Sequence, residues 1–285
     1  MDDELADELR EVAELLVAEA AGFVRTRRAE VRDDLGHAGG SSVRTKSSPT
    51  DPVTVVDTET ERLVRDRLAE LRPGESILGE EGGGDAVEAG AVRWVVDPID
   101  GTVNFLYGIP SYAVSLGAQI DGVSIAGAVA DVVTGDVYSA AAGRGAHVVT
   151  ADGRRRLRCN EIGDLSMALV GTGFGYSPQR RAVQAALLAQ LLPAVRDVRR
   201  IGSAALDLCM VAAGRLDAHY EHGLSLWDWA AAALIAAEAG AVLVLPGTAD
   251  ENGPPGAPLL IAAAPGIAAQ LTAALDRLGG LKPIA

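Results

Sequence analysis

Apolar residues recur every three to four positions at the start of the chain and predict an amphipathic helix over residues 2–28. A polar segment rich in Gly, Ser and Pro follows, and it predicts a loop that can act as a mobile flap. A second helix is expected from Asp57, with Asp57 and Thr58 as the candidate capping residues.

The middle of the chain has the pattern of strands. A short apolar segment precedes Gly79-Glu80-Glu81, and residues 92–96 predict a strand that stops at Asp97-Pro98, because proline cannot continue the ladder. From residue 113 to about residue 158, apolar runs are separated by Asp-Gly and Thr-Gly-Asp turns. These consecutive hairpins predict an antiparallel sheet.

The second half of the chain alternates between strands and helices, which predicts helices packed on a sheet. The expected strands are 168–170, 217–220, 241–245 and 259–263, and the expected helices are 178–192, 203–213, 226–239 and 265–278. We therefore expect an α/β (α+β) protein whose N-terminal half, residues 1–160, packs against a C-terminal half, residues 161–285, as one globular unit.

Composition and charge narrow the class of function. Hydrophobic residues make up 48% of the chain and aromatic residues only 4%, so the core is expected to use small side chains in closely packed elements. The net charge of −14 disfavours direct nucleic-acid binding, and clustered carboxylates suit divalent cations. The richest basic run is interpreted as the solvated edge of a hairpin. It consists of Arg154, Arg155, Arg156 and Arg158.

Cysteine usage and hydropathy suggest the compartment. Cys159 and Cys209 are isolated from each other and are expected to be reduced, buried thiols. The first residues are acidic and lack the apolar core of a signal peptide, and no apolar run has the length of a membrane span. These features predict a cytoplasmic protein without a membrane segment.

The segment Asp97-Pro-Ile-Asp-Gly-Thr102 is the strongest candidate for chemistry. A turn at the proline can bring the carboxylates of Asp97 and Asp100 to one side with the Ile99 carbonyl between them, and hard cations prefer such oxygen ligands. Gly101 allows close backbone approach, and a helix that starts near Thr102 would turn free N–H groups toward a phosphate. An ordinary turn with an Asp cap accounts for these two aspartates equally well.

Other acidic residues are ambiguous when each is taken alone. Glu80 and Glu81 read as a solvated pair. Asp228 lies between two tryptophans at the head of an apolar helix, so it either caps that helix or meets a cation. Asp57 lies at a helix-capping position, and a capping role does not exclude a functional one. Lys46 in the flap-like loop is either a residue that reaches a phosphate or a solvated side chain.

Two further patterns are weaker. Gly171-Thr-Gly-Phe-Gly175 follows a strand but lacks the GxGxxG spacing of a dinucleotide loop. His219 and His222 have no third soft ligand nearby, which disfavours a zinc site. The sequence contains no GxSxG nucleophile motif.

Three segments together resemble the signatures of the inositol monophosphatase family, and most closely its SuhB-type bacterial branch. They are GEE at residues 79–81, WVVDPIDGTVNF at 94–105 and WDWAAAALIAAEAGA at 227–241. The resemblance extends to residues 46–61 and 199–223 and so covers most of the chain. It implies a layered αβαβα sandwich of the inositol monophosphatase and fructose-1,6-bisphosphatase type, a homodimer, Mg²⁺ dependence and Li⁺ inhibition.

The resemblance also implies a metal site with two to three Mg²⁺ ions. One ion would be held by Glu80, Asp97 and the Ile99 carbonyl. A second would be held by Asp97, Asp100 and Asp228, and a third, weaker ion would lie near Glu80 through waters. All of these metal positions match the family pattern in this chain.

The remaining roles that the resemblance implies concern water and substrate. Asp57 and Thr102, beside Glu80, would orient or deprotonate the attacking water, and Gly101 and Thr102 would bind phosphate through backbone N–H groups. Residues expected near the inositol hydroxyls are Gly202, Ser203, Ala204, Glu221 and one of Arg199 and Arg200.

The implied function is Mg²⁺-dependent hydrolysis of myo-inositol 1-phosphate, or of a related sugar or polyol monophosphate, by direct attack of water. Fructose-1,6-bisphosphatase, histidinol-phosphatase and nucleotide 3′-phosphatase activities share the metal motif and stay open. A different class, a scaffold with an added regulatory partner, is disfavoured as the sole role by the complete carboxylate set.

Overall fold

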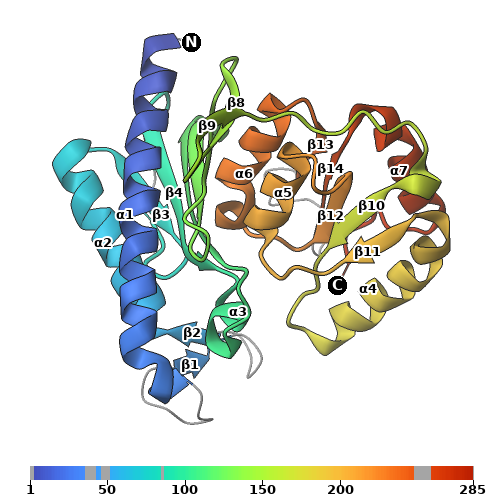
Figure 1. The fold of residues 1–285 in the computed structure, drawn as a ribbon, viewed down its shortest axis with the longest axis horizontal. Coiled ribbons are helices and arrows are strands. Elements are labelled where there is room, and N and C mark those ends of the chain that lie inside the picture. Colours follow the sequence, from blue (N-terminus) through green and yellow to red (C-terminus); the bar gives the residue numbers. More distant parts are fainter. Residues whose placement is uncertain (1–2, 36–42, 46–51, 85–86, 247–257, 285) are drawn as a thin grey trace.

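The computed structural model describes residues 3–35, 43–45, 52–84, 87–246 and 258–284. Its main elements form five layers in the order helix, sheet, helix, sheet, helix (Figure 1). One helical layer lies between the two sheets, and the other two cover their outer faces. This arrangement confirms the predicted layered αβαβα fold.

The first sheet has seven strands in the order β3-β4-β5-β6-β7-β8-β9. Every neighbouring pair is antiparallel except β3 and β4, which are parallel. The predicted hairpins are therefore confirmed from β5 onward. The strands are β3 (Ser76–Gly79), β4 (Val92–Asp100), β5 (Ala113–Ile120), β6 (Val123–Asp131), β7 (Val137–Ala141), β8 (Gly145–Thr150) and β9 (Gly153–Arg156).

Helices α1 (Asp3–Leu35) and α2 (Val55–Leu71) cover the outer face of this sheet. The predicted apolar stripe of α1 is buried, with Leu9 and Leu16 packed in one core with Trp94 of β4. The helix runs seven residues past the predicted end at residue 28, and Val31, seven positions after Val24, continues the stripe against this core.

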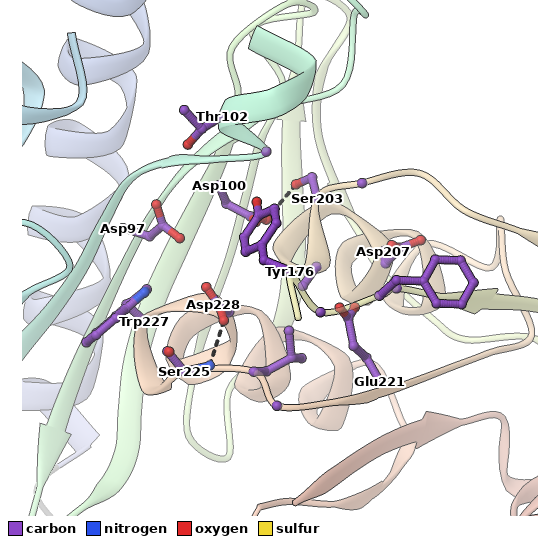
Figure 2. Close-up of a pocket in the computed structure, with 18 of the residues that line it drawn as sticks. Asp97, Asp100, Thr102, Tyr176, Ser203, Asp207, Glu221, Ser225, Trp227 and Asp228 are labelled. Atoms are coloured by element: carbon purple, nitrogen blue, oxygen red, sulfur yellow. Dashed lines mark hydrogen bonds between the residues drawn. The ribbon is translucent and has the colours of Figure 1, made fainter. Parts of the chain in front are cut away.

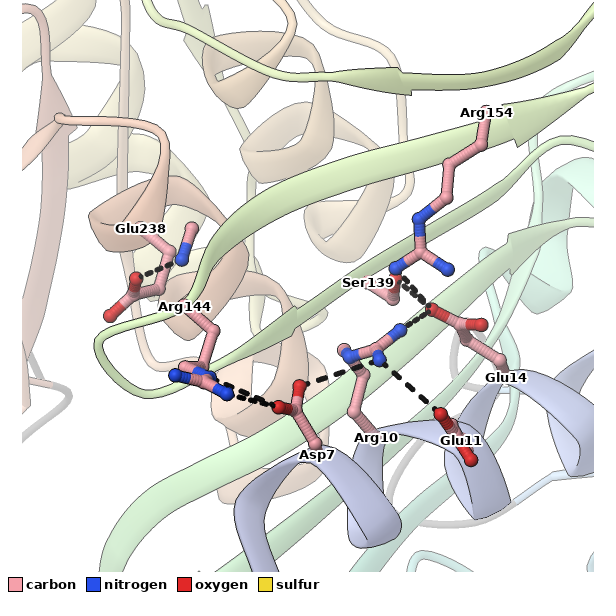
Figure 3. Close-up of polar contacts among 9 residues, drawn as sticks. Asp7, Arg10, Glu11, Glu14, Ser139, Arg144, Arg154 and Glu238 are labelled. Carbon is pink, nitrogen blue, oxygen red and sulfur yellow. Dashed lines mark hydrogen bonds and ion pairs between the residues drawn. The ribbon is translucent and has the colours of Figure 1, made fainter. Parts of the chain in front are cut away.

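Polar side chains also attach α1 to the distant strands of the same sheet (Figure 3). Glu14 accepts a hydrogen bond from Ser139 at 2.5 Å and lies 3.3 Å from the Arg154 guanidinium. Asp7 forms an ion pair with Arg144 at 2.9 Å. Since such partly solvated pairs contribute at most about 1 kcal/mol each, the buried apolar stripe supplies most of the stability and the ion pairs orient the helix.

The middle layer consists of α5 (Ala204–Ala212) and α6 (Leu226–Glu238). The small residues allow α6 to approach the first sheet closely: a Cβ on Gly127 of β6 would lie 2.9 Å from the Cβ of Ala231. Gly117 of β5 meets the α6 backbone in the same way, at 3.1 Å from the Ala231 nitrogen. The prediction of close packing from an Ala-rich, aromatic-poor composition is confirmed here.

The second sheet has the strand order β11-β10-β12-β14-β13, with β10 parallel to both of its neighbours and the remaining pairs antiparallel. Helices α4 (Pro178–Leu191) and α7 (Pro265–Arg277) cover its outer face. Two 3₁₀ turns, Leu165–Met167 and Leu192–Ala194, lie in the connections. The strands are β10 (Leu169–Thr172), β11 (Asp197–Arg199), β12 (Ala218–His222), β13 (Val242–Val244) and β14 (Leu259–Ala263).

Three local predictions were wrong or incomplete. The helix α2 begins at Val55 with Thr54 as its N-cap, because Thr54 and Asp57 form a capping box in which Asp57 is the third helical residue. Part of the predicted flap-like loop is a hairpin of β1 (Val43–Thr45) and β2 (Pro52–Thr54). The edge strand β11 was missed because two of its three residues are exposed and charged.

Several smaller expectations can also be compared with the structure. Both cysteines are free, but only Cys209 is fully buried. The strand β9 is an exposed edge, as the arginine run predicted. Among the described residues, no helix is both long and apolar enough to cross a membrane. The division of the chain at residue 160 stays a prediction, although residues 76–156 form one sheet and residues 169–263 the other.

Candidate functional site

A cavity of about 470 Å³ opens where the end of β4, the starts of α3 (Thr102–Tyr107), α5 and α6, and the end of β12 meet. Its lining is strongly acidic, with two arginines, Arg180 and Arg200, among the lining residues. The acidic side chains are Glu80, Asp97, Asp100, Asp207, Glu221 and Asp228.

Three of these carboxylates point toward one another (Figure 2). Asp97, Asp100 and Asp228 each offer one oxygen, and these oxygens lie within 4.8 Å of one another. Residues 97 and 228 are 131 positions apart in the sequence. The fold therefore brings together three aspartates that local patterns left as separate candidates and that the family resemblance grouped as ligands of one ion.

The backbone around Pro98 determines where the first two carboxylates lie. β4 continues through Pro98 to Asp100, so the predicted stop at residue 96 is wrong. Its pairing with β5 shifts register between Asp97 and Asp100, and such an irregularity accommodates a residue that has no N–H to donate. The Ile99 nitrogen donates to Asp97 Oδ1 at 3.0 Å, which fixes the first carboxylate.

The other two aspartates are held by helix starts of the middle layer. Asp100 Oδ2 accepts hydrogen bonds from Ser203 Oγ at 2.6 Å and from the Ala205 nitrogen at 2.7 Å, at the beginning of α5. Asp228 Oδ2 accepts from the Ser225 nitrogen at 2.6 Å, at the beginning of α6. Asp228 therefore both caps its helix and joins the acidic group, so the two interpretations are compatible.

Burial and mutual repulsion act together on these carboxyl groups. Burial raises the pKa of Asp97 and of Asp228 well above their ordinary values, and the neighbouring carboxylates raise both further. Burial raises the pKa of Asp100 to about 6, although its bonds to Ser203 and Ala205 oppose the shift. Within the described part of the chain, no Lys or Arg side chain pairs with these three aspartates. The donor set therefore fits a divalent cation, which would supply the missing positive charge.

Asp57 and Thr102, to which the family resemblance assigns a joint role, meet at the side of this group. Thr102 Oγ1 lies 3.1 Å from Asp57 Oδ1 and 3.0 Å from the Ile99 carbonyl oxygen, within donating distance of both. Asp57 is fully buried, and burial raises its pKa to about 7, although hydrogen bonds from Thr54 oppose the shift. Thr102 lines the cavity, and Asp57 lies behind it.

Glu80 reaches the cavity from a tight turn after β3, and a residue that sequence reasoning missed shapes this turn. Glu61 of α2 accepts hydrogen bonds from the Glu81 nitrogen at 2.7 Å and the Gly82 nitrogen at 2.9 Å. A Cβ on Gly79 would lie 2.3 Å from the Glu61 carboxyl group, so the glycine makes room for it. The position of Glu61, one helical turn after Asp57, was the available signal.

Replacing Glu61 by glutamine is expected to weaken the binding of a divalent cation in this cavity about tenfold, because an amide cannot accept both backbone hydrogen bonds at full strength and the turn that carries Glu80 loosens. Isothermal titration calorimetry with Mg²⁺ as the probe ion measures this affinity. The matched control is Glu59→Gln, since Glu59 lies on the same helix and pairs with Arg27 at 2.7 Å outside the cavity. An unchanged affinity for Mg²⁺ in Glu61→Gln would contradict the assigned role.

The segment 200–204 and β12 form the opposite wall. Gly202, Ser203, Ala204, Glu221 and Arg200 all line the cavity. Arg199 lies on the edge strand β11, where its guanidinium bonds to Asp197 at 2.6 Å, and it does not line the cavity. Of the two arginines that the sequence left open, Arg200 therefore has the geometry to face a substrate.

Backbone contact between Gly101 and Gly202 joins the two walls of the cavity. A Cβ on Gly101 would lie 3.1 Å from the Gly202 carbonyl oxygen, and both glycines have a φ of 97°, which side chains rarely adopt. Asn104, which sequence reasoning missed, donates to the Ser111 and Ile201 carbonyls at 2.7 and 2.9 Å. The start of α3 is thereby tied to the 200–204 segment.

The two weaker motifs form neither a zinc site nor a dinucleotide loop. His222 bonds to the Gly280 carbonyl at 2.7 Å, whereas His219 lies beside Asp207 and Glu221, so the two histidines do not converge. The 171–175 glycine segment begins in β10, leads toward α4 and borders the cavity through residues 173–175, but it lacks the GxGxxG spacing of a dinucleotide loop. Lys46 lies outside the described residues.

Comparisons with known proteins agree along the whole chain. The profile of the inositol monophosphatase family matches residues 5–278. An inositol-1-monophosphatase from Mycobacterium leprae (strain TN) is 69% identical over 284 residues, which cover 98% of this chain and 97% of that protein. The inositol-1-monophosphatase SuhB of Mycobacterium tuberculosis (strain ATCC 25618 / H37Rv) is 64% identical over 281 residues, 97% of this chain and 96% of that protein.

A structural comparison leads to the same family. The solved structure of Mycobacterium tuberculosis SuhB superposes with a TM-score of 0.82 at 59% sequence identity, and the match covers 97% of this chain and 98% of that chain. The family likeness includes the segments that carry Glu80, Asp97, Asp100 and Asp228. The resemblance that the three sequence segments indicated is thereby confirmed: the chain belongs to the inositol monophosphatase family and is a phosphatase.

Proposed function

We propose that this phosphatase hydrolyses myo-inositol 1-phosphate, with Mg²⁺, to inositol and inorganic phosphate. The observation that carries the proposal is the convergence of three aspartates, two of them buried and Asp228 partly exposed, at one end of a cavity whose other end presents Glu221 and the 200–204 segment. The first end suits a cation and a phosphate, and the second suits a polyol. The mycobacterial relatives that are named inositol-1-monophosphatases support this substrate.

In this proposal the metal ligands are those that the sequence indicated: Glu80, Asp97, the Ile99 carbonyl, Asp100 and Asp228. All five residues line the cavity. When bound, Mg²⁺ would act as a Lewis acid that offsets the charge of the phosphate oxygens and lowers the pKa of water. We propose two to three ions per site on the family likeness.

The chain's own groups then have separate tasks. The carboxyl group of Asp57 lies within hydrogen-bonding distance of the Thr102 hydroxyl and orients the attacking water through it. Gly101 and Thr102 begin α3 beside the aspartates and hold the phosphate through their N–H groups. Water attacks phosphorus in line and gives up a proton, the bond from phosphorus to the inositol oxygen breaks, and the leaving oxygen takes up a proton, so that inositol and inorganic phosphate result.

Glu221 is assigned to the inositol hydroxyls. Its side chain is 13% exposed and lines the cavity, so it is open to a bound polyol while its surroundings are largely dry. Because a carboxylate accepts hydrogen bonds more strongly than an amide oxygen, Glu221→Gln is expected to lower kcat/KM for inositol 1-phosphate about tenfold. The kcat/KM for p-nitrophenyl phosphate, which has no hydroxyl groups, should change by less than about twofold.

A substrate panel tests the proposed substrate itself. It consists of inositol 1-phosphate, fructose 1,6-bisphosphate, histidinol phosphate and a nucleoside 3′-phosphate, compared by kcat/KM. The highest value for inositol 1-phosphate would support the proposal. A tenfold preference for any other member would replace inositol with that alcohol and leave the metal site assignment standing.

Other parts of the proposal rest on family membership. These are inhibition by Li⁺, a homodimer and a cytoplasmic location. Activity measured over a Li⁺ titration, light scattering on the purified protein and fractionation of the producing cells address them in turn.

A further inference from the structure

We propose that His219 is a positioning residue that holds the Glu221 carboxylate in place for the hydroxyl groups of the substrate, with Asp207 supporting the imidazole from behind. The role of Glu221 rests on the proposed function. The contacts among the three side chains rest on the structure alone.

The fold brings these residues together for a simple reason. Side chains alternate between the two faces of a strand, so His219 and Glu221 share one face of β12 while Tyr220 packs into the core on the other. Asp207 lies in the first turn of α5 and lines the same cavity. Figure 2 shows Asp207 and Glu221 together on the side of the cavity away from Asp97.

The three side chains form a row. His219 Nε2 lies 3.5 Å from Glu221 Oε2, and His219 Nδ1 lies 3.8 Å from Asp207 Oδ2. His219 is fully buried and Asp207 is 1% exposed, whereas Glu221 reaches the cavity. Neither ring nitrogen makes a hydrogen bond to the described residues at these distances. Unpaired polar atoms in a buried place raise the free energy of the folded protein. A small shift on substrate binding that brings both carboxyl groups within hydrogen-bonding distance of the imidazole would therefore be favourable.

Two glycines of the 171–175 segment create the space for this row. A Cβ on Gly171, which pairs with His219 across β10 and β12, would lie 3.0 Å from both His219 Nδ1 and Asp207 Oδ1. A Cβ on Gly173 would lie 2.0 Å from Glu221 Oε2. The glycine pattern that resembled a dinucleotide loop therefore serves the packing of the row.

The charges around the imidazole agree with this geometry. Burial alone would lower the pKa of His219, but Asp207 and Glu221 outweigh it, so the net shift is upward. Asp100, beyond this row, acts in the same direction. Burial raises the pKa of Asp207 to about 7, and the imidazole opposes that shift. The imidazole of His219 thus lies between two carboxyl groups, and of the two only Glu221 is assigned to the hydroxyl groups of the substrate.

Kinetics with two substrates test the positioning role. His219→Leu is expected to raise KM for inositol 1-phosphate about tenfold, or about 1.4 kcal/mol, with kcat within about twofold of wild type. KM for p-nitrophenyl phosphate should stay within about twofold. His219→Gln, which keeps a donor toward Glu221, should recover part of the loss. In the Glu221→Gln background, His219→Leu should add little, because both changes act through one carboxylate.

His147→Leu is the matched control, since His147 lies on β8 away from the cavity and should leave both KM values unchanged. If His219→Leu raised KM equally for both substrates, or lowered the melting temperature without changing substrate preference, His219 would have a structural role only. An inositol 1-phosphate KM that stays within twofold in His219→Leu, while Glu221→Gln raises it, would overturn the proposal.

Histidine NMR gives a readout that does not depend on the substrate. The His219 ring signals, assigned by their loss in His219→Gln, should titrate above the ordinary histidine pKa and move lower in Glu221→Gln and in Asp207→Asn. If the pKa of His219 stayed unchanged in both Glu221→Gln and Asp207→Asn, the proposed contacts among the three side chains would be wrong. If instead the NMR result is as expected but wild-type protein does not hydrolyse inositol 1-phosphate, the proposed function fails and the contact between His219 and Glu221 remains.

Discussion

Asp97→Asn is expected to lower kcat with Mg²⁺ by at least about a thousandfold while the protein stays folded. Asp97 is the aspartate assigned to both of the main metal positions, so its charge cannot be replaced by a single neighbour. The asparagine side chain has nearly the same shape, and its Oδ1 can still accept the hydrogen bond from the Ile99 nitrogen. Activity at saturating Mg²⁺ measures the loss of kcat, and a thermal denaturation curve shows whether the variant is folded.

A control variant shows whether the lower kcat follows from the missing negative charge or from a disturbed turn at residue 97. Asp131 provides the matched control, because its Oδ1 accepts a similar bond from the Val133 nitrogen at 2.8 Å but it does not line the cavity. Asp131→Asn should therefore retain wild-type turnover. If Asp97→Asn kept a tenth of wild-type activity, the central metal role of this carboxylate would be wrong.

The second large effect is a loss of stability with rising pH in metal-free protein, which Mg²⁺ counteracts. In metal-free protein, burial raises the pKa of Asp100 to about 6 and that of Asp57 to about 7, against an unfolded value of 3.8, and the pKa of Asp97 shifts in the same direction. The folded state then binds more protons than the unfolded state, so the free energy of unfolding falls as pH rises from about 4 to about 8. The upward shift of His219 adds to this fall.

Mg²⁺ needs the ionised carboxylates and so stabilises the folded state most at high pH. We expect the melting temperature in EDTA to drop by several degrees between pH 5 and pH 8, and the increase caused by Mg²⁺ to grow over the same interval. Denaturation curves followed by tryptophan fluorescence at each pH measure both quantities. A Mg²⁺ effect of the same size at pH 5 and pH 8 would argue against a metal bound by these aspartates.

The secondary structure was predictable where the hydrophobic pattern is strong. The stripe of α1 and the hairpins from β5 to β9 follow directly from period and turn residues. Errors arose where a side chain bonds to its own backbone, as in the Thr54 cap of α2, or where a strand tolerates a proline through a register shift, as in β4. Such local exceptions depend on hydrogen bonds that periodicity does not encode.

In the candidate site too, local sequence patterns identified some residues, and only tertiary contacts identified the others. The aspartates at 97, 100 and 228 could be named because their neighbours in sequence form recognisable segments. The roles of Glu61 and His219 were missed, since Glu61 bonds to the turn after β3 and His219 lies beside Asp207 of α5, and these contacts join elements that are distant in sequence. Arg199 and Arg200 are adjacent and chemically identical, and only their position relative to the edge strand β11 separates them.

The sequence alone determined that this chain has an acidic, phosphate-compatible segment at residues 97–102, alternating layers of helices and strands, and the family to which it belongs. The tertiary structure decided that the segment ends in a cavity closed by Asp228 on one side and by Glu221 on the other. The physical reason is that chemistry at a site depends on distances between side chains. These distances result from packing α5 and α6 between two sheets, which no local pattern specifies.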